Sequence, residues 1–270
     1  MINSKTNKIS RKVENDDLTS QKLFDLYVHY YPNLINSIKN LNAFNRNISH
    51  PLLISPFKEY YDSTIRLMFV GKETHYWILN KEIPFLNEKS NKNDIEKLLL
   101  NYEIELSKTN QRSPFWQFCH ILNNEFNSSN KSFIWNNCIK VDENGKTPEW
   151  EVTKASSINY DKELKTFVPA NLDITNASIN YPILLKEIEI LEPNVIVFFT
   201  GSLFDELLVY LFPGRILTRI NDMVSRVEHS KLPFHSYKTS HPKRLRILGA
   251  FDETLEIIKL EIAKGLKSVE

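Results

Sequence analysis

Cysteine is scarce in this sequence, with only Cys119 and Cys138 among 270 residues. Two cysteines are too few for a disulfide scaffold, a four-cysteine iron–sulfur cluster or a zinc ribbon. Both lie in apolar stretches of the chain, which favours reduced residues of the protein core. The seven histidines are scattered and form no HExxH or HxH pair, so we expect no metal site and no cofactor.

Long apolar runs are missing as well. No run approaches the roughly 20 residues of a membrane helix, and no apolar segment follows the basic N-terminal residues, as a secretory signal would require. We therefore expect a cytoplasmic protein with no membrane partner. The formal net charge is only +1, so any attraction to nucleic acid must come from local clusters of basic residues.

The composition that remains is that of an ordinary globular protein, with 41% hydrophobic and 25% charged residues. Residues 1–17 are polar and mixed in charge, which predicts a disordered or loosely packed tail. The length fits a single domain over residues 18–270, and apolar residues at helical spacing predict a helical extension at 18–45.

Four short apolar runs predict buried β-strands. They lie at Ile65–Val70, Ser132–Asn137, Val195–Thr200 and His235–Thr239, and helical patterns separate them. A helix start is clearest at Ser113-Pro114, and the last helix is expected at about residues 247–264. This alternation predicts a three-layer α/β/α fold with a central four-stranded parallel sheet. Residues 142–180, with few periodic apolar residues, are predicted to form irregular loops.

Polar side chains follow three of these strands. They are the groups of Gly71–Tyr76, Asn136-Asn137 and Ser240–Pro242. Each has an ordinary explanation as a solvated loop or turn, but the carboxyl ends of parallel strands meet at one edge of a sheet, where open α/β sheets bind ligands. The pattern therefore predicts a ligand site at that edge.

On these residues the chain resembles the uracil-DNA glycosylase superfamily, over roughly residues 50–263. Four landmarks carry the resemblance: strands that end in VGKETHY, WNN and FFTG, and the segment SHPKRLR before the final helix. The loop with the His-Pro pair is the most specific of the four.

The resemblance implies a role for the first motif in binding the base and orienting water. Gly71 and Lys72 fall in the base-binding turn, and Glu73 falls on the Asp or Asn that positions the attacking water. Thr74 replaces a proline of the family, and His75 stands where a tyrosine screens out bases with a substituent at C5. These departures put uracil specificity in doubt.

The other landmarks imply base recognition and DNA contacts. Asn136 falls on the asparagine that reads the edge of the flipped base, Phe85 lies near the aromatic on which the base stacks, and His241 matches the histidine that donates to a base oxygen. Leu245 falls on the apolar wedge that fills the vacated stack. The expected DNA-binding set is Lys243, Arg244, Leu245 and Arg246, a basic segment suited to phosphate contacts.

The sequence thus predicts a monofunctional DNA glycosylase that flips out and hydrolyses uracil or another modified pyrimidine and leaves an abasic site. A bulky base of the kind carried by phage DNA is one option, so base-excision repair and antiviral defence both stay open. DNA is the expected partner and a monomer the expected state. The alternative is a catalytically inactive nucleic-acid-binding protein on the same scaffold.

Other enzyme classes fit less well. The loop after the first strand has neither GxGxxG nor GxxxxGK[ST], so a dinucleotide or P-loop phosphate cradle is missing. Gly201-Ser202 lacks the GxSxG elbow of a serine hydrolase, and Ser202 is better explained as a helix cap. Tyr76 and Trp77 could line a pocket, whereas Trp116 and Trp135, next to strands, are expected in the core.

Overall fold

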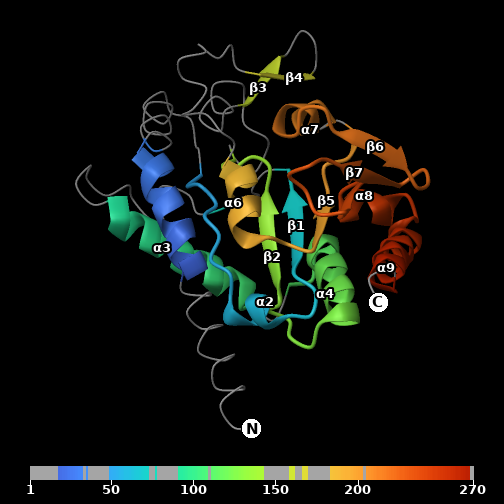
Figure 1. The fold of residues 1–270 in the computed structure, drawn as a ribbon, viewed down its shortest axis with the longest axis horizontal. Helices are drawn as coiled ribbons and strands as arrows, with labels where there is room; N and C mark the ends of the chain where they lie inside the picture. Colours follow the sequence, from blue (N-terminus) through green and yellow to red (C-terminus); the bar gives the residue numbers. More distant parts are fainter. Residues whose placement is uncertain are drawn as a thin grey trace.

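The structure is a computed structural model, which describes residues 18–32, 35, 49–72, 77, 91–108, 111–142, 158–161, 166–169, 183–202 and 205–267. A six-stranded sheet with the order β2-β1-β5-β8-β7-β6 lies at its centre (Figure 1). Its strands are β1 (Leu67–Gly71), β2 (Phe133–Asn137), β5 (Val195–Phe198), β6 (Ile216–Arg219), β7 (Val224–Glu228) and β8 (His235–Thr239). The helices are α2 (Lys58–Asp62), α3 (Asn91–Leu106), α4 (Pro114–Phe126), α6 (Ile183–Leu191), α7 (Asp205–Leu211), α8 (Pro242–Ile247) and α9 (Phe251–Lys267), and residues 18–32 are also helical.

The mixed α/β class and the four parallel strands β2, β1, β5 and β8 are confirmed. The prediction of a sheet with only four strands is wrong, because β7 and β6 extend it on the β8 side with antiparallel pairing. Strand β6 lies at the sheet edge and is mostly exposed. It therefore lacks the apolar run by which the buried strands were found.

Two further boundaries differ from the prediction. Within residues 142–180, expected to be irregular, β3 (Ile158–Asp161) and β4 (Thr166–Pro169) form an antiparallel pair. The predicted last helix, at about residues 247–264, corresponds to α9, and the short helix α8 that precedes it was not predicted. The break between them lies at Gly249, whose φ of +68° interrupts a right-handed helix and suits glycine.

One face of the sheet is covered by helices α4, α8 and α9, which pack against one another (Figure 1). Aromatic rings fill this layer: Phe118 of α4 lies 5.1 Å from Phe199 and 5.4 Å from Phe251 of α9, between ring centroids. Helix α4 begins where the sequence predicts, with Ser113 as its N-cap and Pro114 in its first turn. This layer directs the first turn of α4 toward the carboxyl edge of the sheet.

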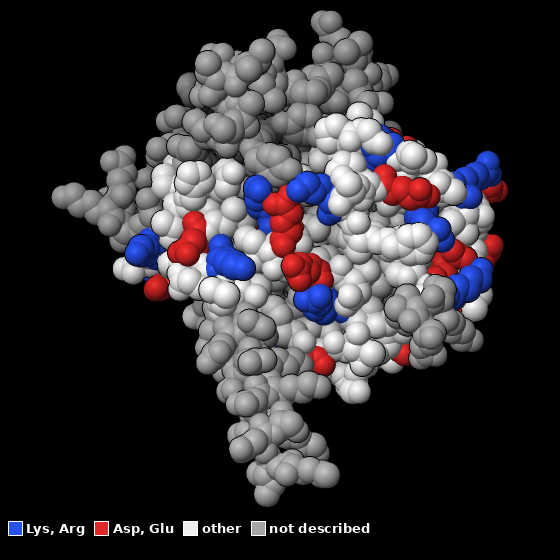
Figure 2. Space-filling view, viewed as in Figure 1, with Lys and Arg blue, Asp and Glu red and all other residues white. Residues whose placement is uncertain are grey.

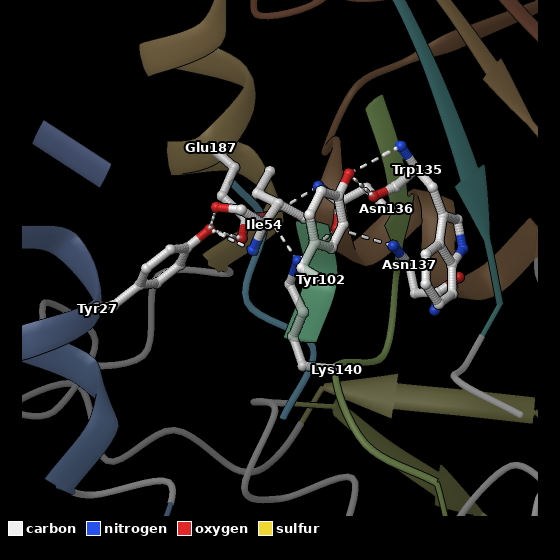
Figure 3. A network of polar contacts seen from close by, with 8 residues as sticks. All are labelled: Tyr27, Ile54, Tyr102, Trp135, Asn136, Asn137, Lys140 and Glu187. Carbon is white, nitrogen blue, oxygen red and sulfur yellow. Dashed lines mark hydrogen bonds and ion pairs between the residues drawn. The ribbon is translucent and has the colours of Figure 1, made fainter. Parts of the chain in front are cut away.

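The opposite face of β2 carries a buried polar network (Figure 3). Glu187 of α6 has no exposed surface and binds three groups at once. Its Oε1 accepts from the Tyr27 hydroxyl at 2.8 Å, and its Oε2 accepts from Asn136 Nδ2 at 2.9 Å and from Lys140 Nζ at 2.5 Å. Burial lowers the pKa of Lys140, and Glu187 opposes that change. Three distant segments are thus joined by one carboxylate.

Two tyrosine hydroxyls serve as substitutes for backbone groups in the same region. The Tyr27 hydroxyl also accepts the Ile54 N–H at 3.1 Å. The Tyr102 hydroxyl of α3 donates to the Trp135 carbonyl at 2.8 Å and accepts the Trp135 N–H at 3.1 Å. Burial raises the pKa of both tyrosines, so the hydroxyls stay protonated. Tyr102 therefore satisfies backbone groups at the outer edge of β2, where no further strand of the described residues pairs.

The hydrophobic core of the described residues runs from Leu23 to Ile262, while the predicted tail at residues 1–17 lies outside the described residues. Within the described part of the chain, no helix is long and apolar enough to cross a membrane. Figure 2 shows Lys and Arg interspersed with Asp and Glu on the face turned to the viewer. On this face, side chains of opposite charge are therefore mixed, and neither sign gathers into a large patch.

The network predicts a large stability difference between two neighbouring carboxylates of α6. Glu187→Ala leaves Lys140 buried without a counter-charge and should cost about 3–5 kcal/mol of unfolding free energy. Glu189→Ala removes partly exposed pairs with Lys186 and Lys231 and should cost about 0–1 kcal/mol. Urea unfolding followed by circular dichroism measures both, and equal losses would contradict this account.

Candidate functional site

A cleft of about 1250 Å³ opens at the carboxyl edge of the parallel strands. The end of β1, the end of β2, the first turn of α4 and the first turn of α8 line it. From β1 the chain crosses to β2 on one side, and it later returns past β1 to β5 on the other. The cleft therefore lies where the strand order reverses, the position at which open α/β sheets bind ligands.

Asn137 supplies a buried amide to this cleft. Its side chain is 1% exposed, lines the cleft, and its Nδ2 has no hydrogen-bond partner among the described residues. A buried N–H without a partner costs roughly 1–3 kcal/mol. An acceptor from a ligand would remove that cost, so Asn137 is a candidate recognition group.

Gly71 makes room for the Asn137 side chain. The two residues are register partners in the parallel pair β1–β2, and a Cβ at Gly71 would lie 2.3 Å from Asn137 Oδ1. Real Cβ atoms do not approach a heavy atom so closely. The glycine after the apolar run of β1 is therefore explained by close approach of the amide, and Gly71 itself lines the cleft.

Asn136 lies elsewhere than the sequence-based role requires. Its amide does not line the cleft and instead binds Glu187 and Lys140 in the buried network. Successive side chains of a strand point to opposite faces, so Asn137 shares the face of Trp135 while Asn136 shares that of Ile134. The amide in the cleft is thus one residue further along than predicted.

His241 lies at the N-terminus of α8, and its ring has a defined orientation. It is the N-cap of that helix, and its Nδ1 accepts the Lys243 backbone N–H at 3.2 Å. The ring stacks on Phe115, with centroids 5.9 Å apart and an angle of 19° between planes. Because Nδ1 accepts, the neutral imidazole carries its proton on Nε2. His241 lines the cleft, as the sequence-based site prediction requires.

Four aromatic side chains form the apolar walls of the cleft: Trp77, Phe115, Trp116 and Trp135. The ring of Trp135 lies 5.3 Å from that of Trp116 and 5.5 Å from that of Trp77, both edge to face. Trp116 and Trp135 were expected in the core, but both are only half-buried. Apolar walls with few polar groups are typical of small-molecule and base-binding pockets.

Basic residues surround these walls. Among the described residues, Lys72, Lys108, Arg112 and Lys243 line the cleft together with one acidic residue, Glu105, which pairs with Lys108. The side chains of Arg112 and Lys243 form no ion pair with any described residue. The cleft is therefore locally cationic although the whole chain is nearly neutral.

The expected DNA-binding segment of α8 divides between surface and core. Lys243 and Arg244 are exposed. Arg246 contacts three neighbours. Its Nη2 donates to Gln117 Oε1 at 3.3 Å, and its Nη1 lies 3.6 Å from Asp252 Oδ1. Its guanidinium carbon lies 3.6 Å from the centroid of the Phe251 ring.

Leu245, predicted to be a surface wedge, is completely buried in the hydrophobic core. It faces inward because α8 packs on α4 and α9. The exposed apolar side chains of this segment are those of Ile247, 68% exposed, and Leu248, 45% exposed.

Three predicted site residues, Glu73, His75 and Phe85, lie outside the described residues. Lys72, which directly precedes Glu73, lines the cleft. In the part of the chain that the structure describes, no three His, Cys, Asp or Glu side chains gather into a possible metal site.

No protein-family model and no curated protein matches this sequence. The geometry of the cleft is therefore the basis for a functional interpretation.

Sequence reasoning placed the Asn136-Asn137 pair at the ligand edge but gave the base-reading role to Asn136, and it missed Phe115 and Arg112. For Asn137 the sequence did contain a signal, which is the glycine at position 71. Gly71 lies two residues after Phe69, so both residues belong to the same face of β1. A glycine at that position leaves space for a neighbouring side chain on that face alone. For Phe115 and Arg112 there was no comparable signal. Both reach the cleft through the position of α4, which packs on α8 and α9. Local sequence does not encode that tertiary contact.

The close approach predicts that Gly71→Ala displaces the Asn137 amide. The added methyl should cost about 1–3 kcal/mol of unfolding free energy and shift the side-chain amide signals of Asn137 in ¹⁵N NMR spectra. Gly214→Ala is the control: it strains a positive φ of 76° but meets no atom within 4 Å, so it should leave the Asn137 signals in place. Unchanged Asn137 signals in Gly71→Ala would contradict the contact.

Proposed function

We propose that this protein is a DNA glycosylase that hydrolyses the N-glycosidic bond of an everted pyrimidine and leaves an abasic site. The observation that supports it most is the convergence, in one aromatic cleft, of two groups: the amide of Asn137, whose Nδ2 has no partner among the described residues, and the oriented imidazole of His241. These groups come from β2 and from the segment after β8, which are about 100 residues apart in sequence. They are the two kinds of group that a flipped base requires: one to read its edge and one to receive its charge.

The chemistry of bond cleavage gives His241 its role in the proposal. As the N-glycosidic bond breaks, positive charge develops on the sugar and negative charge on the departing base. A fixed donor aimed at a base oxygen stabilises the negative charge, as an oxyanion hole does. His241 can offer Nε2–H for this purpose, since Nδ1 already accepts a hydrogen bond. The stacked ring of Phe115 limits its rotation.

The sugar needs a second group, a carboxylate that stabilises the oxocarbenium-like state and orients the attacking water. Glu73 is our candidate, because in the sequence it directly follows Lys72, a residue that lines the cleft. Its assignment rests on the sequence motif, since Glu73 lies outside the described residues.

The aromatic walls supply the energy of base binding in this proposal. Everting a base from a duplex costs a few kcal/mol, and stacking on an aromatic side chain returns about 1–3 kcal/mol. Trp116 and Phe115 are half-buried and line the cleft, so their rings are available for such stacking. A single-stranded or damaged site would lower the cost of eversion further.

The size of the cleft bears on the substrate. Its volume of about 1250 Å³ exceeds the roughly 300–1000 Å³ typical of pockets for drug-sized ligands. A bare uracil would leave much of this space to water. The volume leaves room for a pyrimidine that carries a substituent as well as for uracil, so phage DNA with defence as a role stays open beside uracil and housekeeping repair.

The second candidate is a catalytically silent nucleic-acid-binding protein. It is favoured by the positions of Asn136 and Leu245, which both take part in the fold and not in the surface roles that the resemblance implies. The basic, aromatic cleft would serve this function as well. The two candidates differ in whether a base is released.

Base release is the direct test. The protein should release a base from either uracil-containing duplexes or modified phage DNA, measured by alkaline cleavage at the abasic sites. Glu73→Gln should abolish release with DNA binding intact, and His241→Gln should slow release about 100- to 1,000-fold. Asn137→Ala should slow it at least about tenfold, the equivalent of one lost hydrogen bond to a buried group.

Asn124→Ala, an exposed amide on α4, is the matched control and should be as active as the natural protein. Binding of DNA without release from any of these substrates would favour the silent binder. Product from uracil alone would count against the defence role.

The basic residues of α8 predict a salt-dependent affinity for DNA. Lys243→Ala and Arg244→Ala should each lower the slope of log affinity against log salt by about 0.7–0.9, since each removes one phosphate contact. Fluorescence anisotropy with a labelled oligonucleotide measures the slope. Lys22→Ala, an exposed lysine on the N-terminal helix, should leave it unchanged, and an equal loss there would argue against a DNA contact specific to α8.

A further inference from the structure

The two asparagines at the end of β2 belong to opposite faces of the sheet but are joined by a hydrogen bond. The backbone N–H of Asn137 donates to the side-chain Oδ1 of Asn136 at 2.8 Å. The amide in the cleft is therefore anchored, through its own backbone, to an amide in the buried network (Figure 3). Whatever fixes the rotamer of Asn136 also fixes the backbone from which the Asn137 side chain extends.

We propose that Lys140 and Glu187 are positioning residues for Asn137, acting through Asn136. Lys140 is 3% exposed and Glu187 is not exposed at all, and neither lines the cleft. Their influence on recognition is thus indirect. The inference rests on the proposed function in so far as it takes Asn137 to be the amide that reads the base.

The charges of the pair decide which way the Asn136 amide points. Its Nδ2 donates to the carboxylate of Glu187, and its Oδ1 accepts from the ammonium of Lys140 as well as from the Asn137 N–H. A flipped amide would place its NH₂ against the ammonium and its carbonyl against the carboxylate, and both contacts would be repulsive. The ion pair therefore leaves one orientation, the one that holds Asn137.

An apolar pair of similar volume could fill this space and could be as stable, because burying two charges costs several kcal/mol per ion before their attraction is counted. Such a pair would not orient an amide. The presence of charge at this position is explained by orientation of Asn136 and not by stability alone.

The same network extends to the N-terminal helix. Tyr27 donates to the second oxygen of Glu187 and accepts the Ile54 N–H, so the carboxylate is held from two sides. Tyr27→Phe removes one hydrogen bond to Glu187 and leaves the ion pair in place. It offers a milder perturbation of the same positioning chain.

The experiment compares Glu187→Gln and Tyr27→Phe with Glu261→Gln in the full chain. Glu261 forms an ion pair of 2.8 Å with Arg226 between α9 and β7, and neither residue lines the cleft. Glu261→Gln is therefore the same chemical change in an ion pair remote from β2. The first readout is the ¹⁵N NMR position of the Asn137 backbone and side-chain amide signals.

The second readout is the ratio of base-release rates for uracil-containing and modified-pyrimidine oligonucleotides. A variant that is merely less stable loses active molecules and lowers both rates together, so the ratio stays constant. Loss of Asn137 positioning should change the ratio by about 5- to 30-fold, the effect of one to two kcal/mol on recognition. Glu187→Gln should change the ratio most and Glu261→Gln not at all.

Displaced Asn137 signals in Glu187→Gln or Tyr27→Phe, with unchanged signals in Glu261→Gln, would support the positioning role. Should Glu187→Gln fail to fold, Tyr27→Phe decides alone. Asn137 signals that stay in place in folded variants of the network would overturn the proposal. If those signals move but the natural protein releases no base from either oligonucleotide, the positioning of Asn137 stands and the proposed function fails.

Discussion

The parallel register of β1 and β2 is the constraint on which the site depends. It places Gly71 directly beside Asn137, and the absent side chain of the glycine provides the space for the amide. The two-residue period of β2 then assigns Trp135 and Asn137 to the face of α4, and Asn136 to the face of α6. The groups that line the cleft and the groups of the buried network thus lie on opposite faces of one strand. A slip of one residue would exchange them, burying the amide of the cleft and exposing the charged network.

The two faces of β2 carry different kinds of side chain and have different structural roles. On the α4 face, aromatic rings meet edge to face and remain half-buried, as walls that can receive a planar ligand. On the α6 face, a buried ion pair and two tyrosine hydroxyls satisfy backbone and side-chain groups that no further strand reaches. The second face is costly to desolvate, yet it gives β2, the edge strand of the sheet, a unique position. Because Trp135 and Asn137 of β2 line the cleft, its shape depends on the position of that strand.

The sequence was informative for elements that are determined by interactions between residues close together in the chain. Apolar runs located β1, β2, β5 and β8, and Ser113-Pro114 located the start of α4. It was uninformative where the decisive contact is tertiary. Strand β6 has no apolar run because it is an exposed edge, and Leu245 is buried because α8 packs on α9, which follows it, and on α4, which is distant in sequence. For Asn136 and Asn137 both asparagines were visible, but the choice between them depended on the register with Gly71, and that pairing is a property of the sheet.

Helix α8 carries two basic side chains, Lys243 and Arg244, that form no ion pair with a described residue. Lysine and arginine near a helix N-terminus oppose the helix dipole, and α8 carries Lys243 and Arg244 there. Arg246 is neutralised within the fold, because it contacts Asp252 and lies over the Phe251 ring. Lys243 and Arg244 are exposed and have no ion pair with a described acid. A phosphate beside them would offset the unfavourable charge, so the bound state of α8 would be better satisfied than the free one. These charges therefore favour an anionic ligand on the side of the cleft that His241 and Lys243 line.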